Sequence, residues 1–105
     1  MDNFKTIYII LDTLEKALDT GLDKNDISAD RLGISQQRRD ALLGMLQNEG
    51  YITGAKFTNF SGGKTNVRVD GIQITIKGLE YLENNTTMQK ACRFLKGVKD
   101  TIPGL

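Results

Sequence analysis

The sequence predicts a mostly helical α+β fold, and two patterns of apolar residues indicate it. Apolar residues recur at three- and four-residue steps in several segments, which is the spacing of amphipathic helices. Between these segments, β-branched and aromatic residues flank a Gly-rich turn at 61–64, as in a β-hairpin. A chain of 105 residues can bury one core without disulfides or metal ions. We therefore expect a single domain over residues 1–105.

Residues that begin and end helices divide the chain into elements. Ser35 and Thr75 are favourable N-caps, and Gly21, Gly33 and Gly50 can each end a helix in a left-handed turn. From these signals we expect helices over residues 4–18, 28–32, 36–48, 76–83 and 87–100, and a strand over 51–57 that pairs antiparallel with 66–70.

Residues 28–48 match the helix-turn-helix pattern. Ala29 lies four residues before Gly33, where a small side chain lets the second helix approach the first, and Gly33 takes the turn. Ile34 and Leu42 fall where the motif needs apolar packing. A hairpin and a closing helix follow, so the sequence predicts a winged helix-turn-helix. We expect the helix-turn-helix at 28–48, a β-hairpin wing at 51–70, and C-terminal helices at 75–102 that include one helix beyond the motif.

Arg39 departs from the helix-turn-helix pattern, because an apolar residue is usual at its position. We expect its alkyl stem to pack on the core while the guanidinium reaches the edge. An acidic partner such as Asp26 or Asp30 is the alternative. If the guanidinium reaches the edge, Arg39→Leu is neutral or stabilising.

The chain resembles a narrower group at three places. These are Leu46, the junction at 49–54 (Glu-Gly-Tyr-Ile-Thr-Gly), and the set Thr75, Lys77, Gly78, Tyr81, Leu82 and Asn84. Together they resemble the YjcQ-like family, over about residues 4–100. The resemblance implies a short winged-helix-like protein of bacterial chromosomes and their phages. The resemblance points to no particular biochemical activity and leaves the function open. The matching residues have roles that we expect to be structural.

Composition argues against several function classes. The chain has no histidine and one cysteine, Cys92, so the usual nitrogen and sulfur ligands of zinc and the His-dependent nucleophiles are missing. Lys64 and Thr65 imitate the end of a P-loop, but Thr58 stands where that motif needs glycine. We expect neither an enzyme nor a cofactor or metal site. A lone cysteine, no signal peptide and no long apolar run predict a cytoplasmic protein without membrane association.

Charge is distributed unevenly along the chain. The net charge is only +1, but residues 1–34 carry 4 basic and 7 acidic side chains, whereas 35–68 carry 5 and 2. The net charge argues against a strongly electrostatic nucleic-acid binder, whereas the basic middle third indicates a polar partner surface. With the helix-turn-helix pattern, we expect double-stranded DNA as the partner. The residues expected to contact DNA are Gln36, Gln37 and Arg38 at base edges, Lys56, Lys64 and Arg68 at phosphates, and Arg31 at the backbone. A small regulator of phage or mobile-element type fits this interpretation.

A protein-interaction module that keeps the fold without binding DNA is the alternative function. Asp40 would lie on the reading face and repel phosphates. Ala41 and Gly44 offer a smooth surface with little hydrogen-bonding capacity, which suits a protein contact at least as well. The sequence leaves this choice open.

The last predicted helix has one apolar stripe, formed by Met88, Ala91, Cys92, Leu95, Val98 and Ile102. The stripe either packs on the first helix or forms a homodimer, since two-fold DNA sites need two copies of the domain. Binding to a membrane surface is the third and least favoured interpretation, because Phe94 is the only aromatic anchor nearby.

Overall fold

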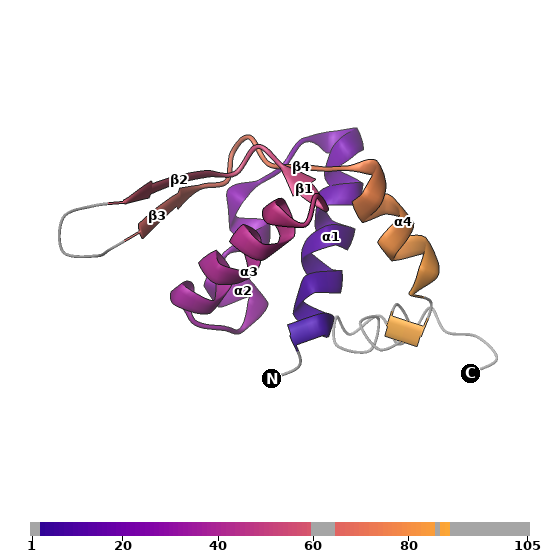
Figure 1. Cartoon of the computed structure of the whole chain (residues 1–105), viewed down its shortest axis with the longest axis horizontal. Helices are drawn as coiled ribbons and strands as arrows, with labels where there is room; N and C mark the ends of the chain where they lie inside the picture. The colour runs from indigo at the N-terminus through magenta and orange to yellow at the C-terminus, as the bar shows by residue number, and fades with distance from the viewer. Residues whose placement is uncertain (1–2, 60–64, 86, 89–105) are drawn as a thin grey trace.

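The structure is a computed structural model, and it describes residues 3–59, 65–85 and 87–88. The elements run in the order α1 (Asn3–Thr20), the 3₁₀ helix η1 (Lys24–Ile27), α2 (Ala29–Leu32), α3 (Gln36–Asn48), β1 (Ile52–Thr53), β2 (Lys56–Asn59), β3 (Thr65–Arg68), β4 (Gln73–Ile74) and α4 (Ile76–Asn84) (Figure 1). The described chain is therefore α+β and mostly helical, with small antiparallel sheets, as the sequence predicts.

The helix ends follow the predicted signals. The Ser35 hydroxyl accepts a hydrogen bond from the backbone N–H of Arg38 at 3.1 Å, and Thr75 does the same for Gly78 at 3.2 Å, so both N-caps are confirmed. Gly33 is left-handed, with φ 70°, and the next N–H returns to the carbonyl of Ala29 at 3.1 Å. This turn lets α2 stop and α3 begin within a few residues.

The predicted long strand is broken into two short ones, which corrects the continuous pairing of 51–57 with 66–70. Thr53 pairs with Gln73 and Lys56 pairs with Arg68. Two residues, 54–55, therefore separate the paired positions on one side of the hairpin, and four, 69–72, separate them on the other. Gly54 causes the break, because its φ of 88° cannot continue a strand. The result is a small β1–β4 sheet near the core and a separate β2–β3 hairpin that projects from it (Figure 1).

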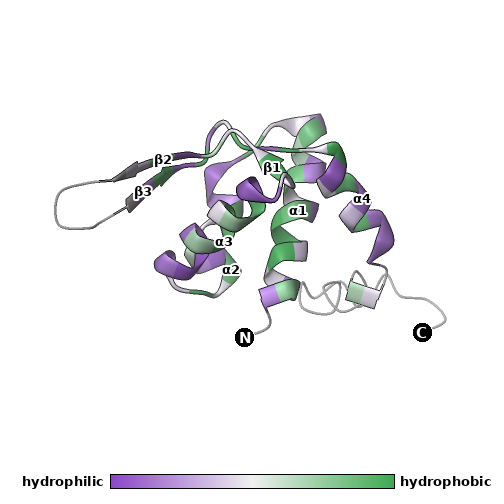
Figure 2. Ribbon diagram, viewed as in Figure 1, coloured by the Kyte–Doolittle hydropathy of each residue, from purple (hydrophilic) through white to green (hydrophobic). Residues whose placement is uncertain are grey.

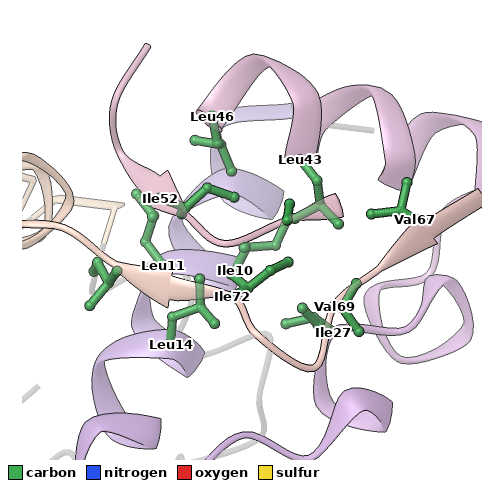
Figure 3. Close-up of a cluster of buried hydrophobic side chains, with 12 residues drawn as sticks. Ile10, Leu11, Leu14, Ile27, Leu43, Leu46, Ile52, Val67, Val69 and Ile72 are labelled. Carbon is green, nitrogen blue, oxygen red and sulfur yellow. The ribbon is translucent and has the colours of Figure 1, made fainter. Parts of the chain in front are cut away.

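The core forms where α1 meets α3 and the start of the hairpin. Figure 2 shows α1 mostly in the hydrophobic colour, and Ile10, Leu11 and Leu14 in its middle are buried. In Figure 3 its side chains meet those of the other elements, and the labelled residues are Ile10, Leu11, Leu14, Ile27, Leu43, Leu46, Ile52, Val67, Val69 and Ile72. Because Val67 and Val69 belong to this cluster, the base of the hairpin is anchored in the core.

Arg39 is buried, with only 7% of the residue exposed, so the expected packing of its stem is confirmed. The expected position and partners of its guanidinium are wrong. Its Nη1 donates to the backbone oxygen of Ile27 at 3.3 Å, and its Nε donates to Asp40 at 2.9 Å. The guanidinium therefore joins α3 to the end of η1, instead of reaching the edge or pairing with Asp26 or Asp30.

The junction between α3 and α4 explains several residues that resemble the YjcQ-like pattern. The Thr75 hydroxyl donates to the carbonyl of Gly50 at 2.6 Å, and Lys77 Nζ donates to that of Glu49 at 2.7 Å. Lys77 also lies over the ring of Tyr51, 4.8 Å from its centroid. The start of α4 thus satisfies carbonyl groups at the end of α3, a role that sequence alone does not reveal for Lys77.

The structure describes little of the predicted C-terminal helix. The helix over 87–100 is helical at 87–88, and the rest of it, including Cys92 and most of the apolar stripe, lies outside the described residues. Along the part that the structure describes, no helix is long and apolar enough to cross a bilayer.

Candidate functional site

α3 buries one side and presents the other to solvent. Its buried residues are Arg39, Leu42, Leu43 and Leu46. The opposite side carries residues at three- and four-residue steps. We call this surface the outer face of α3, and it consists of Gln37, Ala41, Gly44, Met45 and Asn48. All of these except the half-buried Gly44 are exposed.

The hairpin is held beside this face by two contacts. The Gln47 side chain donates to the backbone oxygen of Ala55 at 3.0 Å and accepts from its N–H at 2.7 Å. The amide therefore replaces the strand partner that Ala55 lacks between β1 and β2. Farther out, the ring of Phe57 lies against Gly44, where an added Cβ would be 3.7 Å from its Cζ. These contacts fix the hairpin relative to α3.

The hairpin carries two cations directly opposite each other. Lys56 and Arg68 are register partners on β2 and β3, and both are exposed. Like charges in this position are unfavourable by themselves. Arg68 has one acidic neighbour, Asp70, at 3.3 Å, and both of those side chains are about two-thirds exposed. Such a pair is screened by solvent, so both cations are available to an anionic partner.

The candidate residues at the start of α3 have different surroundings. Gln36 donates to Asp40 at 3.1 Å, and Arg38 donates to Asn3 of α1 at 2.7 Å. Gln37 has no side-chain hydrogen bond within the described residues. Two of the three side chains expected to read bases, Gln36 and Arg38, are therefore held by solvent-exposed intramolecular hydrogen bonds. Among the described residues, the third, Gln37, has no such bond.

The other candidates lie apart from this group or outside the description. Arg31 is exposed on α2. Lys64 lies outside the described residues. The structure therefore brings Lys56 and Arg68 together as predicted phosphate contacts, and it leaves Arg31 on a separate helix.

Asp40 is less of an obstacle to an anionic partner than the sequence indicates. Its side chain is 15% exposed, and it accepts hydrogen bonds from Arg39 and Gln36. Its pairing with the buried guanidinium of Arg39 offsets its negative charge, a partner that sequence reasoning did not assign to it.

Two exposed apolar side chains at the site were not predicted from the sequence. Met45 is 58% exposed and Phe57 is 40% exposed. Met45 falls outside the buried stripe of α3, which is a signal that the helical spacing contains. Phe57 gives no such signal, since the alternation of a strand does not tell which face is covered.

These features define a small, mostly helical α+β domain in which a cationic hairpin lies beside an exposed helix face. The family described as YjcQ protein matches residues 8–101 of the chain. The chain belongs to this family, which confirms the resemblance seen at Leu46, at 49–54 and at the start of α4.

Comparisons with the YjcQ protein of Bacillus subtilis, in sequence and in structure, agree with this assignment. The chain is 32% identical to the protein of strain 168 described as "Uncharacterized protein YjcQ", over 97% of this chain and 99% of that protein. It is also similar to the solution NMR structure of the YjcQ protein from Bacillus subtilis, at 30% identity and a TM-score of 0.50. That similarity covers 77% of this chain and 92% of that one.

Proposed function

We propose that this chain is a winged-helix protein that binds double-stranded DNA, as a small regulator of phage or mobile-element type. In this proposal α2 and α3 form the helix-turn-helix, α3 enters the major groove, and the β2–β3 hairpin is the wing. The element order and the tight turn at Gly33 support the assignment.

The observation that carries the proposal is the cation pair on the hairpin. Lys56 and Arg68 face each other at an unfavourable like-charge position, which bound phosphate would relieve. No acidic residue occurs between Glu49 and Asp70 in the sequence. The hairpin therefore presents positive charge beside the outer face of α3, although the net charge of the chain is near zero.

The remaining candidate residues differ in whether their side chains already make hydrogen bonds within the protein. Gln37 can contact a base directly, since its side-chain amide makes no hydrogen bond to any described residue. Gln36 and Arg38 must exchange exposed hydrogen bonds for contacts with DNA, at a small net cost because both bonds are open to solvent. Arg31 contacts the DNA backbone from α2.

The salt dependence of binding tests the proposal. Affinity for a mixed-sequence duplex is measured by fluorescence anisotropy between about 50 and 200 mM salt, and the slope of log K against log salt is about −0.9 for each phosphate contacted. We expect the double variant Lys56→Ala/Arg68→Ala to lower affinity and reduce this slope by about two units.

A matched control separates local contacts from net charge. Lys16→Ala/Lys24→Ala removes the same charge from exposed positions on α1 and η1, and we expect it to leave the slope unchanged. Equal losses in both double variants, or no measurable binding by the unmodified chain, would refute the proposed surface.

A protein-interaction module remains the second candidate function. The exposure of Met45 and Phe57 beside the smooth surface of Ala41 and Gly44 favours it, because aromatic residues and methionine are enriched in protein interfaces. With this function no duplex binds, and Gly44→Arg blocks the partner while the fold is retained.

A further inference from the structure

The outer face of α3 has an unusual composition for a surface next to cations. At its centre, Ala41, Gly44 and Met45 offer carbon atoms and no side-chain hydrogen-bonding groups except the weakly accepting thioether. Met45 is 58% exposed, and the ring of Phe57 extends the apolar surface across Gly44 toward the hairpin. One turn before Ala41, Gln37 carries a side-chain amide without a partner among the described residues.

We infer that this face reads A·T base pairs through the 5-methyl group of thymine. The inference rests on the proposed DNA binding and adds its specificity. The thymine methyl is the one apolar group that a base edge presents in the major groove, and apolar side chains contact it there. Met45 and Ala41 take the methyl groups, and Gln37 pairs with N6 and N7 of adenine.

Charge complementarity identifies DNA, rather than an apolar peptide, as the occupant of this face. Lys56 and Arg68 lie on the hairpin that flanks it, and Asp40 is turned away into its pair with Arg39. The face is therefore apolar at its centre and cationic at its side. In the major groove, anionic phosphate backbones flank the base edges, so the cationic side of this face complements the phosphates while its apolar centre faces the bases.

The test compares duplexes that differ by the methyl group alone. The first probe is an alternating A·T duplex, and the second is the same duplex with every thymine replaced by deoxyuridine, which keeps the charge and the hydrogen-bonding groups. We expect the second probe to bind at least about fourfold more weakly, since each buried methyl contributes a factor of that size. In an alternating G·C duplex, 5-methylcytosine in place of cytosine should strengthen binding.

Variants assign the effect to the outer face. Met45→Gln keeps a side chain of similar length and helix propensity, and we expect it to remove most of the preference for thymine over deoxyuridine. The control is Leu18→Gln on α1, since Leu18 is 57% exposed and so closely matched to Met45. We expect the control to keep the full preference.

The outcomes distinguish this inference from the proposed function. Salt-dependent binding with equal affinity for thymine and deoxyuridine duplexes would overturn the methyl readout and leave DNA binding intact. A preference that survives Met45→Gln would overturn the assignment to this face. Failure to bind any duplex would overturn both and leave the apolar face to a protein partner.

Discussion

Gln47 offers the sharpest test of how the hairpin is held beside α3. Its amide makes both hydrogen bonds to the backbone of Ala55, at 2.7 and 3.0 Å, and Ala55 is only 7% exposed. A hydrogen bond contributes about 0.5–1.5 kcal/mol net, and leaving a buried group unpaired costs more. We therefore expect Gln47→Ala to reduce the free energy of unfolding by about 2 kcal/mol.

Urea denaturation measures this loss, and two further variants define its cause. Gln47→Glu keeps the length and the acceptor but places a carboxylate against the Ala55 oxygen, so we expect a loss at least as large. Gln37→Ala, at an exposed glutamine of the same helix, should change the free energy of unfolding by less than about 0.5 kcal/mol. If Gln47→Ala lies within that same small range, the two bonds do not hold the hairpin and the reasoning is wrong.

Three further substitutions test the packing. Gly54→Ala should cost more than about 3 kcal/mol or prevent folding, because φ is 88° and an added Cβ would overlap the backbone of Gly71; a urea midpoint near that of the unmodified chain would contradict this. Gly78→Ala should destabilise by about 2 kcal/mol although alanine favours helices, since its Cβ would meet a backbone oxygen at 2.5 Å; higher stability in a thermal melt would show that α4 moves aside. Arg39→Leu should cost about 1–3 kcal/mol in urea denaturation, because it leaves a buried carbonyl unpaired; a neutral or stabilising result would show that carbonyl to be solvated.

Local signals account for the part of the fold that could be predicted from sequence. Ser35 and Thr75 cap their helices, and Gly33 makes the turn, because each effect depends on a few neighbouring residues. The break after β1 combines the φ of 88° at Gly54 with the close approach of its backbone to that of Gly71, which is distant in the sequence. A glycine inside a strand pattern indicates a bulge or a close backbone approach, but it does not identify Gly71 as the partner.

Side-chain partners account for the part of the site that could not be predicted. Lys56 and Arg68 are exposed on the hairpin, as expected for charged residues of the predicted wing. The bond from Arg38 to Asn3 joins positions 35 residues apart, and the pairing of Asp40 with Arg39 depends on rotamers. Helical spacing places these residues on a face, but it does not say which of them are already engaged.

The most direct test of the account is a map of amide chemical-shift changes as a mixed-sequence duplex is added to the full chain. We expect the largest changes along the outer face of α3 and in β2 and β3, with α1 and η1 changing least because residues 1–34 carry 7 acidic and only 4 basic side chains. Changes centred on α1 and η1, or none at all at concentrations well above the micromolar range, would contradict DNA binding through α3 and the hairpin.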